Sequence, residues 1–319
     1  MNNKPPKVVV TDKDLAMENA IQSVMPYAVH RLCAWHLQNN VYVNAPYPSF
    51  KKKFNELLYQ YCTEEEFKAI WTSMISDFNF EDKRWVSQTY NNRKSWAECF
   101  LRGSFFGGFR TTQRSESINF YLSYFHTSKL KLKDLVSQVD KATQGICYTE
   151  REDDFISNHT SLIFPSNVLH QYYQKASIVL TRNIYEKVAT QITSALAYSI
   201  NSIEVAFEYK LYSLTHFPKG LVRSRVRNHN HDGPINCTCM LFESVGIPCR
   251  HIFAVLKHLN PPCIPETLFK ERWKKDAKNI INLNTFPHSR VPGDVFVSNR
   301  WGTLTSQFNA MWVLCYKAE

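Results

Sequence analysis

Three cysteines and one histidine lie within the fifteen residues CTCMLFESVGIPCRH, which run from Cys237 to His251. Cys237 and Cys239 form a C-x-C pair, and after nine intervening residues Cys249 and His251 form a C-x-H pair. Thiolates and imidazoles are ligands that Zn²⁺ prefers, and four of them with no neighbouring carboxylate suit a closed, tetrahedral, structural site. The spacing therefore predicts one structural zinc ion bound by these four residues.

The residues around the four ligands predict how the chain brings them together. A strand precedes Cys237, Gly246 and Pro248 shape a turn, and Cys249 begins a helix with an apolar face. This order predicts a small ββα unit, which has little core of its own without a metal. The alternative is that the cysteines are small buried core residues, as free cysteines often are.

The pattern C-x-C-x9-C-x-H followed by an apolar helix resembles the SWIM zinc finger. The stretch GIPCRH, which ends at His251, is typical of SWIM fingers in plant transposase-related proteins. This resemblance implies a structural Zn²⁺ ion as the cofactor.

Two carboxylates form a second candidate site. Asp12 ends the β-branched run VVVT, and Glu116 lies in the first turn of a helix that opens with TTQRSES. Two-metal phosphoryl-transfer sites use carboxylates for Mg²⁺ or Mn²⁺. Acids at strand ends and in first helical turns also act as caps and complement the helix dipole, so the residues alone favour structural roles.

A longer resemblance links these sites. The stretch from Val8 to Val41, the stretch SFFGGFRTTQRSESINFYLSYF and the finger resemble, in this order, the Mutator-like transposase core of the plant FAR-RED IMPAIRED RESPONSE and FAR-RED ELONGATED HYPOCOTYL family. That family implies an RNase H-like fold with a D-D-E triad. Asp12 matches the second acid and Glu116 the third, while Cys33 and His36 match a C-x-x-H element.

The match to the triad is incomplete in this sequence. The family carries its first aspartate on an earlier strand and a zinc-containing DNA-binding domain further upstream, whereas only eleven residues precede Asp12. Because a two-metal site needs a carboxylate that bridges both ions, we expect an N-terminally truncated, non-catalytic chain in which Asp12 and Glu116 are vestigial. Cys33 and His36 supply two ligands where zinc needs four, so core packing beside Trp35 and an inherited metal or DNA-end role both stay open.

The coarse pattern predicts an α+β protein. Apolar residues recur at helical spacing through most of the chain up to about residue 200, and an alternating pattern then predicts strands up to the finger. We therefore expect a partial RNase H-like transposase region with a helical insertion at residues 1–200, a SWIM domain at 201–275 and a C-terminal tail at 276–319.

Composition indicates where such a chain works. No run reaches the roughly 18 apolar residues that a membrane span needs, and the N-terminus has no signal-peptide pattern. Clustered cysteines then favour metal binding in a reducing compartment. The net charge of +10 and the pI near 9.1 favour acidic partners, although the basic clusters at 51–53, 129–133 and 223–227 can each be ordinary solvated surface.

The resemblance implies a nuclear, non-catalytic transcription regulator of the far-red-response type, derived from a transposase. Its expected partners are proteins, including a homo- or heterodimer with family members, and DNA only weakly without the N-terminal domain. One alternative is an active DDE transposase or nuclease, if an upstream aspartate is restored. Another is a truncated copy without a folded product, because a strand at residues 8–11 that lacks its neighbours would expose unpaired backbone groups and aggregate.

Overall fold

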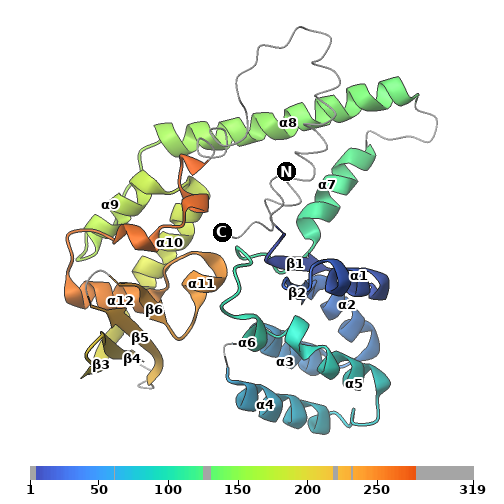
Figure 1. Cartoon of the computed structure of the whole chain (residues 1–319), viewed down its shortest axis with the longest axis horizontal. Coiled ribbons are helices and arrows are strands. Elements are labelled where there is room, and N and C mark those ends of the chain that lie inside the picture. The colour runs from blue at the N-terminus through green and yellow to red at the C-terminus, as the bar shows by residue number, and fades with distance from the viewer. Residues whose placement is uncertain (1–4, 61, 125–130, 218–221, 231–232, 278–319) are drawn as a thin grey trace. The chain divides into compact units, whose positions relative to one another are not determined.

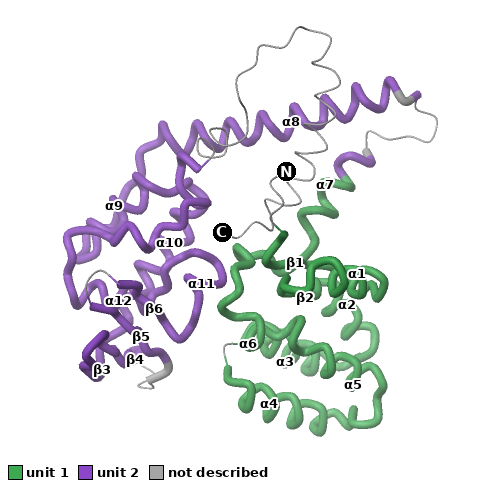
Figure 2. Tube along the Cα trace, in the orientation of Figure 1, with its two compact units in different colours: residues 1–120, 290–319 green, residues 121–289 purple. Residues whose placement is uncertain are grey.

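The computed structural model of the chain describes residues 5–60, 62–124, 131–217, 222–230 and 233–277 (Figure 1). The predicted tail at 276–319 lies outside this range except for its first two residues. The chain divides into unit 1, residues 1–120 with 290–319, and unit 2, residues 121–289 (Figure 2). This division differs from the predicted boundary near residue 200, which instead marks the change from helices to strands inside unit 2.

Unit 1 begins with two parallel strands, β1 (Val8–Thr11) and β2 (Val29–Leu32), joined by helix α1 (Leu15–Val24). Parallel neighbours need such a crossover because the chain must return to the start of the sheet before the next strand begins, and a tight turn joins only antiparallel strands. The register pairs Thr11 with Leu32, so Asp12 and Cys33 follow the two strands at the same, carboxyl-terminal end of the sheet. These two strands agree with a mixed helix and sheet fold, but they do not establish the RNase H-like core that the resemblance implies.

Helices form the rest of unit 1: α2 (Ala34–Asn44), α3 (Pro48–Tyr59), α4 (Glu64–Asp77), α5 (Arg84–Asn91), the 3₁₀ helix η1 (Arg93–Ser95) and α6 (Glu98–Leu101). They confirm the helical spacing of this region. Their shared core is mainly aromatic, and its largest buried side chains include Phe50, Phe54, Phe67 and Trp96.

A buried ion pair fixes the segment that leads to Glu116. Arg31 of β2 donates to Glu98 of α6 over 2.7 Å, and these side chains are only 3% and 4% exposed. Arg110 lies 3.6 Å from the other carboxylate oxygen, and its backbone carbonyl accepts a hydrogen bond from the Ala34 amide. The loop before α7 (Gln113–Tyr124) is thereby held against the end of β2.

Unit 2 combines helices with an antiparallel sheet. Its helices are α8 (Leu132–His159), α9 (His170–Val179), α10 (Arg182–Ala195), α11 (Leu241–Val245) and α12 (Arg250–Leu259), followed by the 3₁₀ turns η2 (Glu266–Leu268) and η3 (Glu271–Trp273). The sheet has the order β3 (Tyr198–Val205), β4 (Tyr209–His216), β5 (Val222–His229) and β6 (Ile235–Cys237). Each strand pairs with the next in sequence, and the strands themselves agree with the alternating pattern of this region.

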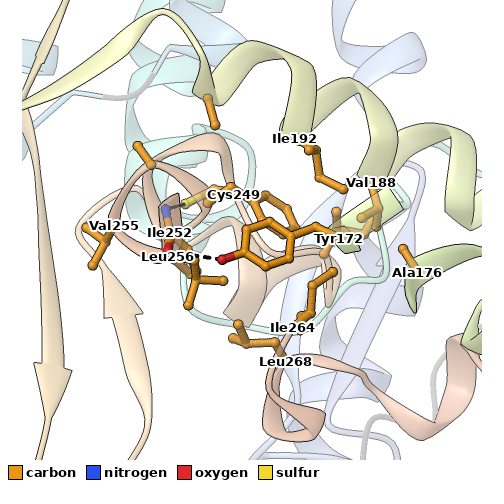
Figure 3. Close-up of a cluster of buried hydrophobic side chains, with 14 of the residues drawn as sticks. Tyr172, Ala176, Val188, Ile192, Cys249, Ile252, Val255, Leu256, Ile264 and Leu268 are labelled. Atoms are coloured by element: carbon orange, nitrogen blue, oxygen red, sulfur yellow. Dashed lines mark hydrogen bonds between the residues drawn. The ribbon is translucent and has the colours of Figure 1, made fainter. Parts of the chain in front are cut away.

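The finger helix α12 lies at the centre of the core of unit 2 (Figure 3). Its residues Ile252 to Leu256 are almost fully buried between the sheet and the helices α9 and α10. Tyr172 of α9 donates its hydroxyl to the Leu256 carbonyl over 3.0 Å. The predicted small ββα unit is therefore wrong in extent, because the finger shares one hydrophobic core with a four-stranded sheet and two preceding helices.

Candidate functional site

The four predicted zinc ligands come from three neighbouring places in unit 2. Cys237 is the last residue of β6, Cys239 lies in the turn that follows, and Cys249 and His251 stand at the start of α12. Their ligand atoms all lie within 4.8 Å of one another. Four ligands around one zinc ion, with sulfur about 2.3 Å from the metal, occupy a space of this size.

The backbone around these ligands is shaped by two left-handed residues. Met240 has φ 51° and Gly246 has φ 80°, so the chain reverses on both sides of the short helix α11. Amide groups also point at the sulfurs, because the Cys239 amide donates to the Cys237 thiol and the Ile252 amide donates to the Cys249 thiol, each over 3.5 Å. Such amides stabilise negative charge on sulfur.

The imidazole of His251 is held in one orientation. Its Nδ1 lies 3.5 Å from the Cys237 sulfur, whereas its Nε2 lies 3.1 Å from the hydroxyl of Ser224 on β5. The ring of Tyr198 meets the imidazole edge to face, with the ring centroids 4.8 Å apart. A metal-binding histidine characteristically donates its second N–H to such an oxygen, so Nδ1 is the atom that faces the candidate site.

The three thiols of the cluster affect one another's pKa values, and a cation would stabilise their deprotonated forms. Hydrogen bonding to Cys239 raises the pKa of the Cys237 thiol, and burial raises the pKa of the Cys249 thiol. The pKa of Cys239 is lowered because the other two thiols donate to its sulfur. Three thiolates this close together would repel one another, and a divalent ion would supply the charge that they need.

The residues therefore fit a structural zinc ion. Cys237, Cys239, Cys249 and His251 would hold it, and the ion would tie the turn after β6 to the start of α12. That they bind zinc stays a prediction, and Ser224 is the residue that the sequence analysis missed. The available signal was the alternation of β5, in which Ser224 precedes the exposed Arg225 and therefore points inward. The contact of Ser224 with His251, however, joins residues 27 positions apart.

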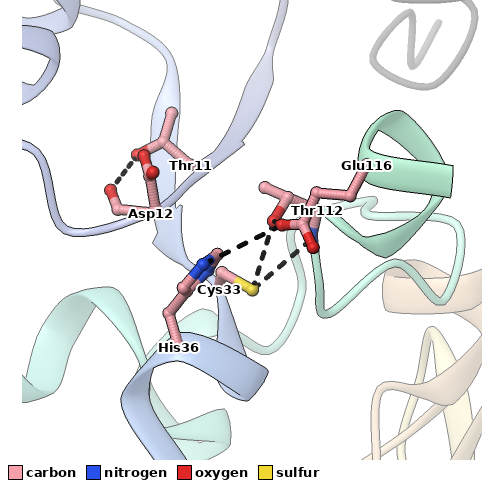
Figure 4. A network of polar contacts seen from close by, with 6 residues as sticks. All are labelled: Thr11, Asp12, Cys33, His36, Thr112 and Glu116. Carbon is pink, nitrogen blue, oxygen red and sulfur yellow. Dashed lines mark hydrogen bonds and ion pairs between the residues drawn. The ribbon is translucent and has the colours of Figure 1, made fainter. Parts of the chain in front are cut away.

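The second candidate site lies at the end of β1 and β2 in unit 1 (Figure 4). Glu116 accepts a hydrogen bond of 2.5 Å from the Thr112 hydroxyl, and its carboxylate lies 4.0 Å from Nε2 of His36. Thr112 also approaches the sulfur of Cys33 with its amide and its hydroxyl, each at 3.4 Å. Thr112 thus links Cys33 to Glu116, and Glu116 in turn lies beside His36.

Asp12 is less closely connected. It is exposed, and the Thr11 hydroxyl donates to its backbone carbonyl rather than to its carboxylate. In the part of the chain that the structure describes, no hydrogen bond or ion pair joins Asp12 to Glu116. Across the same residues, the finger cluster is the only group of three or more Cys, His, Asp or Glu side chains close enough to hold a metal ion.

Cys33 and His36 differ in their surroundings. Cys33 is 1% exposed and belongs to the core, whereas Trp35, beside which it was expected to pack, is 51% exposed and contacts the His36 ring edge to face. The roles of Cys33 and His36 stay open. The sequence analysis missed Thr112, which contacts Cys33 and Glu116, because its contact with Cys33 joins residues 79 positions apart.

Comparisons with known proteins find one family match in each of the two regions that carry the candidate sites. The family model described as the MULE transposase domain matches residues 1–40, and the one described as the SWIM zinc finger matches residues 225–260. The first match contains Asp12, Cys33 and His36, and the second contains all four candidate zinc ligands. No solved structure matches the chain significantly. None of the described helices combines the length and the apolar character needed to cross a membrane.

Relatives from Arabidopsis thaliana match across most of the chain. Protein FAR1-RELATED SEQUENCE 5 is 26% identical over 293 residues, which are 90% of this chain and 37% of the relative. Protein FAR-RED IMPAIRED RESPONSE 1 is 25% identical over 290 residues, which are 88% of this chain and 34% of the relative. Protein FAR1-RELATED SEQUENCE 4 is 28% identical over 286 residues, with coverages of 88% and 38%.

The chain thus spans little more than a third of the length of these relatives. The two family models match it in the order that the sequence resemblance predicts. The protein is a homologue of the FAR1-related sequence and FAR-RED IMPAIRED RESPONSE 1 proteins over about 90% of its length, with a MULE transposase match at its N-terminal end and a SWIM zinc finger in unit 2.

Proposed function

We propose that the chain is a non-catalytic, nuclear regulator of transcription, derived from a Mutator-like transposase and stabilised by a structural zinc ion. Protein partners and DNA are the contacts through which it acts. The assignment of residues 1–200 to the transposase-like region and of 201–275 to the finger region is part of this proposal.

One contrast between the two candidate sites carries the proposal. The finger has all four ligand atoms within 4.8 Å, amides directed at its sulfurs and a hydroxyl that orients its histidine. The acid site has Glu116 beside His36, while Asp12 is exposed and outside any described metal-binding group. A structural site is thus complete, whereas a two-metal site needs further carboxylates.

A reporter assay tests the regulatory role. The full chain is fused to a heterologous DNA-binding domain that places it at a promoter, and a fluorescent fusion reports its location. We expect nuclear fluorescence and a changed reporter output that Cys249→Ser abolishes, because this variant removes a buried ligand of the finger. Bound zinc, measured by mass spectrometry of the native protein, should fall from one ion per chain to none.

Cys263→Ser is the matched control. Cys263 is an exposed cysteine outside the cluster, so the same exchange there should leave zinc content and reporter output unchanged. An unaltered reporter in the wild-type fusion would contradict the regulatory role. Full zinc content in the Cys249→Ser variant would contradict the structural site.

The second candidate is a DDE transposase or nuclease. It is favoured by one observation, namely that Asp12 and the Cys33–Thr112–Glu116 contacts lie at the same end of the parallel strands, where α/β enzymes bind their ligands. Nicking of a supercoiled plasmid with Mn²⁺ tests it. Cleavage by the wild-type chain that Asp12→Asn abolishes would replace the non-catalytic proposal. We expect the wild-type chain to nick the plasmid no more than the Asp12→Asn variant does.

A further inference from the structure

The four-stranded sheet of unit 2 has one covered face and one open face. Tyr212, Leu214 and Val226 point into the core beneath α12. Because side chains alternate along a strand, the residues between them point the other way. The open face consists of Ser202 and Glu204 of β3, Tyr209, Leu211, Ser213 and Thr215 of β4, and Arg225, Arg227 and His229 of β5.

Two arginines stand out on this open face. Arg225 and Arg227 are exposed, and neither forms an ion pair with any carboxylate among the described residues. Both stand on β5, two positions apart, so their Cα atoms are separated by about 6.8 Å. The Arg227 guanidinium lies over the ring of Tyr209, 4.6 Å from its centroid, which presents the charge group beside an aromatic face.

The remaining residues of the open face are mostly polar. Ser202 of β3 places an exposed hydroxyl group on this face, whereas Ser213 is only 5% exposed and the hydroxyl oxygen of Thr215 is buried. Leu211 is the large aliphatic side chain of the face. Protein interfaces characteristically have a broad apolar or aromatic centre with a polar rim, whereas Leu211 and the arginine-covered ring of Tyr209 are the large apolar groups described on this face. Arginines and hydroxyls are instead the groups that contact phosphate oxygens in nucleic-acid complexes.

We propose that the open face of the β3–β6 sheet binds the phosphate backbone of nucleic acid, through Arg225 and Arg227, without reading base sequence. This inference rests on the proposed function and names the surface by which the chain contacts DNA. Glu204 stands on the face, opposite Leu211 and one strand further from Arg227. Glu243 lies beside the face, where its carboxylate accepts a hydrogen bond from Asn236, the partner of Arg227 in β6. The negative charge of these two residues opposes the binding of a polyanion.

The experiment measures binding of the full zinc-loaded chain to a fluorescent 20-base-pair duplex of mixed sequence, by anisotropy between 50 and 200 mM salt. The double variant R225A/R227A should bind about tenfold more weakly at low salt, and the slope of log K against log salt should fall by about 2, one for each lost phosphate contact. The variant R225K/R227K keeps both charges and should restore most of the slope. Glu204→Gln should tighten binding two- to threefold.

The matched control is K52A/K68A. Lys52 of α3 and Lys68 of α4 are exposed lysines of unit 1 without an ion pair in the described residues, so this variant loses the same charge elsewhere. It should keep the wild-type affinity and slope. Circular dichroism and zinc content of every variant establish that folding is intact.

Three results would overturn the inference. One is no duplex binding by the wild-type chain at 50 mM salt. Another is equal weakening by K52A/K68A and R225A/R227A, which would indicate diffuse electrostatics. The third is displacement of the duplex by polyglutamate at equal charge concentration, which would indicate an acidic protein as the partner. The reporter assay places the chain at DNA through a foreign domain, so its failure and the failure of this inference are separate outcomes.

Discussion

At the scale of single residues, the finger depends on a hydroxyl outside the four ligands. Ser224 lies 3.1 Å from Nε2 of His251 and is 8% exposed, so water cannot easily replace it. When Nδ1 faces a metal, Nε2 carries the proton and the Ser224 oxygen accepts it. The hydroxyl therefore selects the tautomer of His251 and fixes the plane of its ring.

We expect Ser224→Ala to weaken zinc binding by about 10- to 100-fold, because loss of the partner of a ligating histidine typically costs that much. Competition with a chromophoric chelator measures the affinity. Ser213→Ala is the control, since Ser213 is another buried serine of the same sheet, on the face that does not meet the finger. Equal zinc affinities of the two variants would show that Ser224 does not orient His251.

At the scale of elements, one buried charge pair joins β2 to α6. Arg31 and Glu98 are 67 residues apart and nearly inaccessible, and the Arg31 guanidinium also lies over the Phe106 ring. Burial lowers the pKa of Arg31, and the neighbouring Glu98 carboxylate opposes this effect. Through Arg110, which lies 3.6 Å from Glu98, the pair holds the loop that leads to Thr112 and α7 against the end of β2.

Glu98→Gln should destabilise the protein by about 3 kcal/mol, because it leaves the Arg31 charge buried without its counter-ion. Urea unfolding followed by tryptophan fluorescence measures the change. Asp77→Asn is the matched control, since it breaks the half-exposed Lys53–Asp77 pair and should cost less than about 1 kcal/mol. A similar loss in both variants would contradict a special role of the buried pair.

The same pair illustrates what sequence could and could not predict. The strand at 8–11, the helices between 50 and 96 and the four gathered finger residues were predicted, because periodicity and ligand spacing are local signals. The contacts Arg31–Glu98, Cys33–Thr112 and Ser224–His251 were not predicted, because they join residues 67, 79 and 27 positions apart. Single sequences carry no direct signal for such pairs.

At the scale of the whole molecule, the chain consists of two compact units with separate cores. The core of unit 1 is built around Phe50, Phe54 and Trp96, and that of unit 2 around α12. The boundary after residue 120 was missed because helical periodicity continues across it, and the change of period near 200 is more conspicuous. Each unit thus carries one of the two candidate sites.

This arrangement predicts how the protein responds to loss of metal. Chelation should destabilise the end of β6 and the start of α12, because the three sulfurs and the His251 imidazole would then crowd together without the cation that their spacing predicts. Peptides that cover residues 222–260 should exchange amide hydrogens at least tenfold faster, since structural zinc contributes directly to folding. Peptides that cover α3 and α4 should keep their protection, because their core is separate. Hydrogen exchange with mass spectrometry, with zinc added back as the control, measures both regions, and equal loosening of unit 1 would show that the two cores fold as one.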